Sequence, residues 1–420
     1  MTSTVETTGA TGPSSKTRFL ATTGLSVAGT ALGLLGATGA TTAAAGEGQS
    51  GALLTGLYMS TVLLTSAVSV PYAPRVARRL GPRRAFVVLQ AVAAGAWIVA
   101  GLALVLGLET MPVLLCAAPV FGITGGLSTV LRPILATSYL SDSAGTAEAF
   151  ARLSVVSGIG WAIGSLGGGF LLSNIALGWG LVLNGLSILP LVATVGRAAP
   201  AVEPSTPRAS DRPWRTAWSA LAGGPTLRWT ALLGASSLVF LAPITSLVVP
   251  IAQDLRQSPL VAGAGLLMAA FSIGELLSPI AVRRLRPGRQ DLPAGAIAGV
   301  IAGVMLLVLG GVSAVLVDRL ELLVWLVVGV AFGAFRYASR AFFTGSAAEA
   351  GPPEDASTNL AAAMLVSGLA APIGTTMWSG VISQVSADAA VLIGGLGALV
   401  FGVVILGVTR ATPRRDAAAG

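Results

Sequence analysis

Apolar runs of about 20 residues recur twelve times along this chain of 420 residues. A helix of that length crosses the roughly 30 Å of hydrocarbon in a lipid bilayer. Hydrophobic residues make up 54% of the chain and charged residues only 10%, against about 25% charged residues in ordinary globular proteins. The runs lie near residues 19–43, 51–73, 85–107, 112–138, 149–172, 176–196, 228–251, 259–282, 292–316, 322–345, 358–382 and 389–409. The sequence therefore predicts an all-α polytopic membrane protein with twelve transmembrane helices.

Several kinds of functional site are disfavoured by the residue types. The chain contains no histidine, a single cysteine (Cys116) and no G-x4-G-K-[ST] phosphate-binding loop. These absences give no support to imidazole metal sites, an internal disulfide or an ATP-driven pump. A membrane-embedded prenyl or glycosyl transferase, the remote alternative, would need clustered carboxylates. Only Glu354 and Asp355 form such a cluster, in a short loop, so we expect no enzyme, no cofactor and no metal.

Basic residues cluster between the apolar runs and set the predicted orientation. The net charge of +8 would suggest a nucleic-acid partner in a soluble protein, but short arginine clusters beside apolar runs are typical of topology signals. Nineteen basic residues lie in the two tails and in the connections after the second, sixth and eighth runs: Lys16, Arg18, Arg75, Arg78, Arg79, Arg83, Arg84, Arg197, Arg208, Arg212, Arg215, Arg228, Arg283, Arg284, Arg286, Arg289, Arg410, Arg414 and Arg415. Only Arg256 and Arg319 lie in connections of the opposite set. Both termini are therefore predicted to be cytoplasmic, in the inner membrane of a bacterium.

Two related halves make up the chain. The pattern P-x3-R-R-L-x-P begins at Pro74 and recurs 205 residues later at Pro279. Residues 157–164 and 367–374 share Ser-Gly and Ile-Gly pairs at an offset of 210. A parallel duplication of this kind is the architecture of two-bundle transporters. The predicted units are a polar tail (1–18), a six-helix bundle (19–196), a cytoplasmic linker with a surface helix near 214–221 (197–227), a second, pseudo-symmetric six-helix bundle (228–409) and a tail (410–420).

These features resemble the major facilitator superfamily over residues 19–409. A glycine, acidic and basic cluster after the second span is the marker by which that family is best known, and the resemblance implies that it acts in conformational change. The matching positions, with their counterparts in the second half, are Arg78, Arg79, Gly81, Arg83, Arg84, Arg283 and Arg284. Pro74 replaces the first glycine and Arg78 replaces the acid. The family's acid-dependent latch is therefore not expected, while the arginines can bind lipid phosphates or helix C-termini.

A glycine-rich signature in the fifth span resembles that of drug–proton antiporters, G-x3-G-P-x2-G-G. The chain supplies Gly160, Gly164, Gly168 and Gly169, with Ser165 at the position of the proline. Glycines let two helices approach closely, which is also the alternative, purely structural explanation. The resemblance implies proton-coupled efflux of a drug-like metabolite or sugar. An importer of a sugar or organic acid remains the alternative function.

Four charged residues lie within predicted spans: Arg132, Glu275, Arg336 and Arg340. An ionisable group in hydrocarbon is costly, so it usually has a partner or a function. Arg336 and Arg340 are four residues apart and therefore share one helical face. We expect Glu275 to be the protonatable carboxylate and one of these two arginines to be its alternating partner. The alternative is a static ion pair that braces the cytoplasmic end of the second bundle.

Polar and aromatic residues in the middle of spans mark a possible substrate cavity. The candidates are Trp161, Thr245 and Ser246 beside Pro243, and Trp378, because mid-span prolines and small polar groups are typical of backbone that faces a water-filled cavity. Since the charged candidates include more arginine than acid, a neutral or anionic small molecule is the expected substrate. Protons and membrane lipid are the other expected partners, and we expect the protein to be a monomer.

Overall fold

The computed structural model describes residues 13–45, 50–140, 145–197, 213–255, 260–285, 291–313, 319–350 and 356–411, and these segments are built from helices without any strand. The elements are α1 (Pro13–Ala44), α2 (Ser50–Ser69), the 3-10 turn η1 (Val70–Tyr72), α3 (Ala73–Leu80), α4 (Pro82–Val105), α5 (Thr110–Leu140), α6 (Gly145–Leu172), α7 (Gly178–Arg197), α8 (Pro213–Gly223), α9 (Pro225–Phe240), α10 (Pro243–Ser246), α11 (Val248–Asp254), α12 (Leu260–Leu285), α13 (Asp291–Ser313), α14 (Arg319–Ala348), α15 (Ala356–Gln384) and α16 (Ala387–Ala411). Twelve of the helical stretches are long and apolar enough to cross a membrane. The predicted fold class is confirmed.

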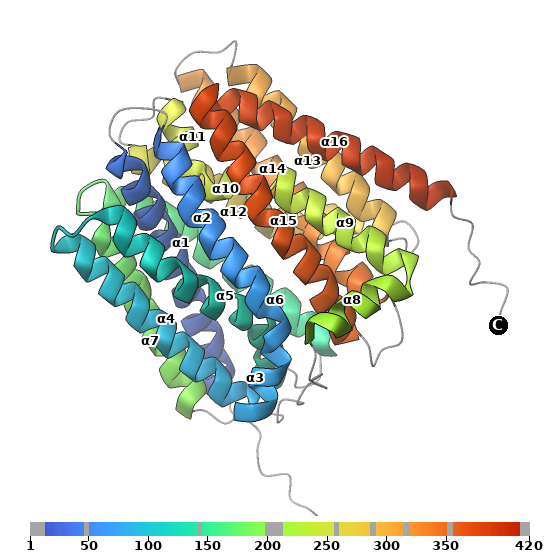
Figure 1. The fold of residues 1–420 in the computed structure, drawn as a ribbon, viewed down its shortest axis with the longest axis horizontal. Helices are drawn as coiled ribbons and strands as arrows, with labels where there is room; N and C mark the ends of the chain where they lie inside the picture. The colour runs from blue at the N-terminus through green and yellow to red at the C-terminus, as the bar shows by residue number, and fades with distance from the viewer. Residues whose placement is uncertain are drawn as a thin grey trace, which may run out of the picture.

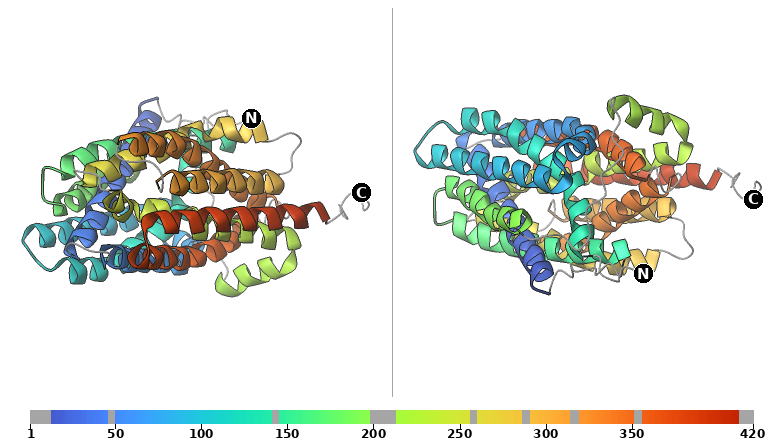
Figure 2. Two further views of the ribbon diagram at one scale, coloured as in Figure 1. Left: turned by 90° about the horizontal axis from the view of Figure 1, so that it is seen from above. Right: turned by 90° about the horizontal axis from the view of Figure 1, so that it is seen from below.

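The twelve spans form two bundles of six that lie side by side (Figure 1). In the first bundle α1 packs on α6 and α7, and α4 packs on α5 and α7. In the second, α13 packs on α14 and α16, and α15 packs on α9. The views from above and below keep α4 and α7 on one side of the molecule and α13 and α16 on the other (Figure 2). Two helix pairs join the bundles, α2 with α15 and α6 with α12.

These two pairs are equivalent under the sequence repeat. The repeat relates the second span to the eighth and the fifth to the eleventh, so it relates the α2–α15 contact to the α6–α12 contact. We call these two helix pairs the bundle seam. Pseudo-symmetry of this kind lets one bundle rock against the other without disturbing the packing inside either.

The connection after the second span differs from the prediction. Residues 74–80 were expected to form a loop, but the chain continues from α2 through η1 into α3. The turn is made at a single residue, Gly81, whose φ of 76° lies in the left-handed region that glycine adopts without strain. The basic side chains of this motif therefore lie on a helix and on the first turn of α4.

The seventh span, predicted as the apolar run over residues 228–251, is broken near Pro243. Helix α9 ends at Phe240, and two short helices, α10 and α11, follow it. Pro243 has no backbone N–H to donate to Val239 and its ring disfavours a helical residue before it, so the helix stops there. The break exposes the neighbouring Thr245 and Ser246 to the interior of the protein.

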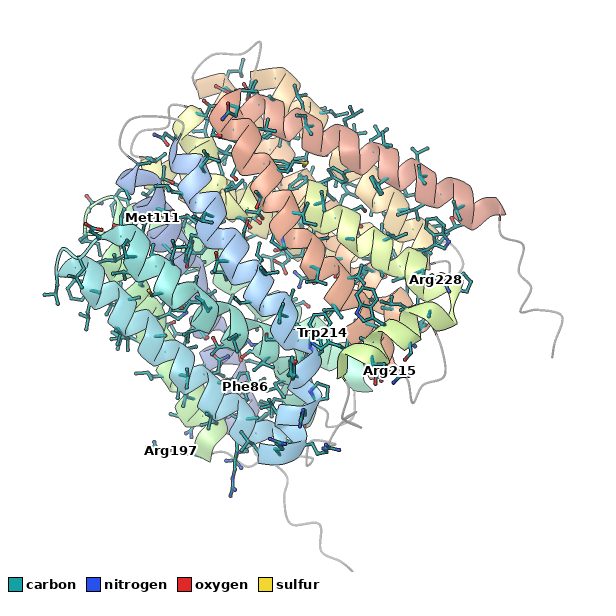
Figure 3. The ribbon with its side chains drawn as sticks, in the orientation of Figure 1. Phe86, Met111, Arg197, Trp214, Arg215 and Arg228 are labelled. Carbon is teal, nitrogen blue, oxygen red and sulfur yellow. The ribbon has the colours of Figure 1, made fainter. Side chains whose placement is uncertain are left out.

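The linker between the bundles contains the predicted surface helix, as α8 (Figure 3). Ala217 and Leu221 are buried, whereas Trp218 is half exposed. Helix α8 packs on α15 and also contacts η1 of the first bundle. Arg228 fixes its C-terminal end by donating to the carbonyl oxygens of Leu221 and Ala222, at 2.8 Å and 2.5 Å.

Several predicted features lie outside the described residues. They are tail residues 1–12 and 412–420, linker residues 198–212, and the loop residues Arg256, Arg286, Arg289, Glu354 and Asp355.

Arg83 ties helices α4 and α7 together at the end that carries the termini. Its Nε and Nη2 atoms donate to the carbonyl oxygens of Val195 and Gly196 at 2.6 Å and 2.8 Å. These carbonyls belong to the last turn of α7, where they lack helical partners and carry the negative end of the helix dipole. The guanidinium fork satisfies two of them at once.

We expect Arg83→Gln to lower the free energy of unfolding by about 1–3 kcal/mol, because it removes two charge-assisted hydrogen bonds. Thermal unfolding of the purified protein in detergent would show a lower melting temperature. Arg84→Gln is the matched control, since Arg84 is exposed and makes no side-chain hydrogen bond within the described segments. Equal melting temperatures for the two variants would contradict the role given to Arg83.

Candidate functional site

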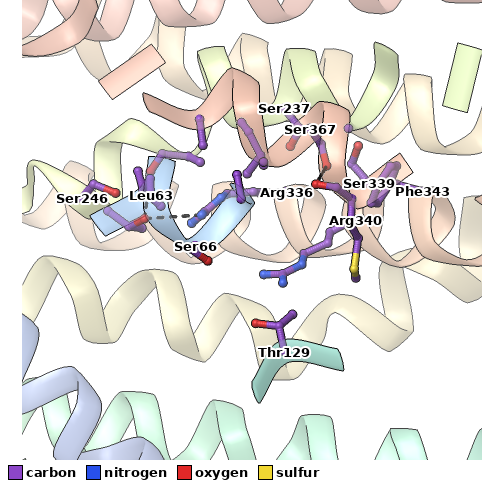
Figure 4. A pocket seen from close by; sticks show the side chains of 18 of the residues that line it. Leu63, Ser66, Thr129, Ser237, Ser246, Arg336, Ser339, Arg340, Phe343 and Ser367 are labelled. Atoms are coloured by element: carbon purple, nitrogen blue, oxygen red, sulfur yellow. Dashed lines mark hydrogen bonds between the residues drawn. The ribbon is translucent and has the colours of Figure 1, made fainter. Parts of the chain in front are cut away.

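A central cavity lies between the two bundles and has two lobes. The first, of about 310 Å³, is lined by α2, η1, α9, α10, α14 and α15, together with Thr129 of α5. The second, of about 450 Å³, is lined by α1, α2, α4, α5, α6 and α7, together with Arg340 of α14. Thr129 and Arg340 line both lobes, and in Figure 4 the Arg340 side chain extends toward Thr129. The two lobes therefore adjoin at residues from both bundles.

Three arginines from two bundles line this cavity: Arg132, Arg336 and Arg340. Arg336 donates to the Thr245 hydroxyl at 3.4 Å, and its other terminal nitrogen, Nη1, is buried without a partner among the described residues. The Nε of Arg132 is likewise buried and unpartnered in this part of the chain. Since each guanidinium carries a full charge at any physiological pH, the cavity is strongly electropositive.

Glu275 of α12 lies next to α14, outside the lining of both lobes. The hydroxyl group of Tyr337 is hydrogen-bonded to its carboxylate, and Arg340 and Arg336 act on it electrostatically. Neither arginine forms a direct ion pair with Glu275 in the described part of the chain, and the Oε2 atom has no hydrogen-bond partner there. The predicted neighbourhood of acid and arginines is thus present, but a hydrogen bond from Tyr337 takes the place of the expected salt bridge.

Glu275 also borders the bundle seam. A Cβ atom added to Gly158 of α6 would lie 2.6 Å from Leu276 Cδ2 and 3.7 Å from Glu275 Cγ. The carboxylate is therefore placed between α14, on its own side, and α6 of the other bundle. A change in its charge would be felt at the contact across which the bundles move.

At the end away from the termini, the backbones of the two bundles come into contact at the seam. A Cβ on Gly169 of α6 would lie 2.9 Å from the Cα of Gly265 on α12. On the pseudo-symmetric pair, Ser60 donates to the carbonyl oxygen of Pro372 at 3.2 Å, and its hydroxyl lies 2.9 Å from that of Thr376. We call these contacts the closed end of the seam.

The four glycines of the fifth-span signature divide between two helices. Cβ atoms on Gly160, Gly164 and Gly168 would meet Gly24, Ala28 and Leu32 of α1, one helical turn apart each time, while Gly169 faces α12. The signature therefore fixes α6 inside its own bundle on one face and forms the seam on the other. It does not line either lobe of the cavity as the described residues form it.

Three of the four predicted cavity residues line the cavity, and one does not. Thr245 and Ser246 line the first lobe and Trp161 lines the second. The prediction for Trp378 is wrong: its side chain is fully buried and packs against Gly394 in the core of the second bundle. An aromatic residue in an apolar helix gives no sign of which helical face it occupies, and this one points to α16.

The basic residues of the family motif lie away from the cavity. The side chains of Arg78, Arg79, Arg84, Arg283 and Arg284 are exposed at the end that carries the termini. The two halves of the motif thus supply basic side chains at the same end of both bundles, where phosphate groups of lipids are within reach.

Sequence reasoning missed most of the second lobe. Tyr58, Gln90, Trp97 and Phe121 all line it. Gln90 had a detectable signal, as an amide within an apolar run, and its side chain donates to Ser128 at 2.9 Å. The aromatic residues had none, because the helices that carry them are apolar on every face.

Comparisons with known proteins agree with this architecture. The sequence model of the Major Facilitator Superfamily matches residues 17–375. No curated protein matches the chain significantly.

Solved structures with the same fold carry different cargoes. The human organic anion transporter MFSD10 (TETRAN) is 17% identical, with a TM-score of 0.62, over 93% of this chain and 99% of that one. The D-xylose-proton symporter is 14% identical, with a TM-score of 0.70, over 93% and 96%. The nucleoside transporter NupG is 14% identical, with a TM-score of 0.66, over 94% and 99%. At these identities the likeness establishes the fold alone.

Proposed function

Since the chain belongs to the major facilitator superfamily of membrane transporters, we propose that it exports a small organic solute by alternating access, coupled to protons. The observation that carries this proposal is the cavity between the bundles, to which both contribute charged side chains. A solute bound there contacts both bundles, so its binding depends on their relative position. Differential binding of this kind is what allows a ligand to drive a conformational change.

The orientation follows from the distribution of arginines. The exposed basic residues of α3, α4 and α12 lie at the end that carries both termini, and by the positive-inside rule this end faces the cytoplasm. The closed end of the seam then faces outward, and the structure corresponds to an inward-facing state. We place the protein in the cytoplasmic membrane of a bacterium.

Coupling to protons is assigned to Glu275. Uptake of a proton by Glu275 removes the negative charge that acts on Arg340 and Arg336 of α14, and loss of the proton restores it. Because the carboxylate borders α6 of the other bundle, the two protonation states favour different positions of the seam. Among the described residues no carboxylate lines either lobe, and Glu275 is the acid that acts electrostatically on Arg336, so we assign the role to this residue alone.

Export is favoured by the α6 signature of the antiporter branch, while import of a sugar or organic acid is the second candidate. One observation favours import: the D-xylose-proton symporter has the same fold. The two functions differ in the direction in which solute and proton move relative to each other. An antiporter exchanges them, and a symporter moves them together.

The direction can be tested with everted membrane vesicles whose interior has been acidified and loaded with a pH-sensitive dye. D-Xylose, uridine and 2-naphthalenesulfonate are added in turn. An exporter releases internal protons in exchange for the entering solute, so the dye should report a rise in internal pH that vesicles without the protein do not show. A solute that acidifies vesicles of either orientation as it enters would support symport and contradict the proposal.

A further inference from the structure

Every charged side chain that the described residues place on the cavity lining is positive. Among the described residues, the two lobes are lined by Arg132, Arg336 and Arg340 and by no carboxylate. Glu275 lies outside both lobes, held by Tyr337. Unpaired charge in a site surrounded by lipid is costly, and an anion is the ligand that removes this cost.

Two of the arginines have side chains free to bind. Arg132 of the first bundle and Arg340 of the second line the same lobe, and within the described segments neither guanidinium donates a hydrogen bond to the protein. Arg336, by contrast, is engaged with Thr245 and lies over the Tyr337 ring, 5.3 Å from its centroid. One guanidinium group can donate two parallel hydrogen bonds to two oxygens of the same carboxylate, sulfonate or phosphate.

Four aromatic side chains also line the second lobe, beside the hydroxyl-bearing residues Ser26, Thr30, Thr124, Ser128 and Thr129. Trp97 and Phe121 are stacked with ring centroids 3.7 Å apart, and Tyr58 and Trp161 line the same space. Aromatic walls bind flat apolar groups through offset and edge contacts. Three of these hydroxyl groups, from Thr30, Thr124 and Thr129, already donate to carbonyl oxygens of their own helices. Gln90 likewise donates to Ser128, which leaves fewer donors for a solute rich in hydroxyl groups.

From this arrangement we propose that the solute is an organic anion with an aromatic or flat apolar body. Its charged end binds between Arg132 and Arg340, and its body lies among Tyr58, Trp97, Phe121 and Trp161. The anion thereby joins the two bundles, since its charged end needs one guanidinium from each. The proposal rests on the proposed transport function and specifies the class of its substrate.

The test compares three probes of nearly the same shape on the purified full-length protein. They are 2-naphthalenesulfonate (anionic), 2-naphthalenesulfonamide (neutral) and 2-naphthyltrimethylammonium (cationic). We expect the sulfonate to raise the melting temperature and to bind at least about tenfold more tightly than the other two. Arg132→Gln and Arg340→Gln should each weaken sulfonate binding by at least about tenfold, whereas Arg215→Gln on the exposed face of helix α8 should not.

Folding is monitored by the melting temperature without probe, and Arg132→Lys and Arg340→Lys replace any glutamine variant that fails to fold. A lysine keeps the positive charge but lacks the planar guanidinium that donates two hydrogen bonds to one anion, so intermediate affinity is expected. Sulfonamide or ammonium binding as tight as that of the sulfonate, or unchanged sulfonate affinity in either arginine variant, would overturn the proposal.

Counterflow in proteoliposomes separates this inference from the function on which it rests. Arginine-dependent binding of the sulfonate without any exchange across the membrane would leave the anion site standing and refute transport. Transport of D-xylose or uridine, with no binding of the sulfonate, would leave transport standing and refute the anion site.

Discussion

Replacing Glu275 with glutamine is expected to uncouple solute movement from the pH gradient. Glutamine keeps the size of the side chain and can still accept a hydrogen bond from Tyr337, but it cannot take up or release a proton. Gradient-driven flux should fall about 5- to 150-fold, the range that corresponds to coupling free energies of about 1–3 kcal/mol. Solute-for-solute exchange without a gradient should persist, because it needs the cavity and the seam but no proton.

The measurement is transport into proteoliposomes with and without an imposed pH gradient. Glu349→Gln is the matched control, since Glu349 is an exposed carboxylate just beyond α14. Tyr337→Phe removes the hydrogen bond but keeps the acid, so it should shift the pH at which coupling occurs without abolishing coupling. If the Glu275→Gln variant retains the full dependence on the gradient, Glu275 has a structural role and the coupling group lies elsewhere.

The helices and the grouping of charges could be predicted from sequence because lipid imposes a large free-energy cost on unpaired backbone groups and on charged side chains. Twelve apolar runs can be accommodated only in lipid, and a helix satisfies its own backbone there. Glu275, Arg336 and Arg340 stood out for the same reason, as charges in an apolar run. The structure does bring these three residues together.

The parts that sequence did not predict depend on helix rotation and on helix ends. The pattern of apolar residues fixes rotation only when one face is polar, and these helices are apolar all round. Trp378 and Trp97 are therefore equivalent in sequence, yet one is packed in the bundle core and the other lines the cavity. Likewise, residues 74–80 are polar enough for a loop but also compatible with the helix they form as α3.

Placing leucine at Gly169 is expected to separate the bundles at the closed end of the seam. The Cα of Gly265 and the carbonyl oxygen of Val261 would each lie 2.9 Å from a Cβ at this position, and backbone atoms cannot move aside as a flexible side chain can. Overpacking of this kind typically costs about 1–3 kcal/mol, and here the cost falls only on the conformation in which α6 and α12 touch. The equilibrium should therefore move about 5- to 150-fold toward states with this end open.

Cross-linking across the second half of the seam measures this shift. Ser60→Cys and Thr376→Cys, introduced into a chain with Cys116→Ser, place two thiols where hydroxyl groups now lie 2.9 Å apart. Disulfide formation should be efficient in this background and at least about fivefold slower when Gly169→Leu is added. Gly167→Leu is the matched control, because Gly167 lies two residues away on an exposed face with nothing within 4 Å of an added Cβ. Since the α2–α15 pair never touches residue 169, slower cross-linking there would mean that the bundles move as rigid bodies, and an unchanged rate would mean that they do not.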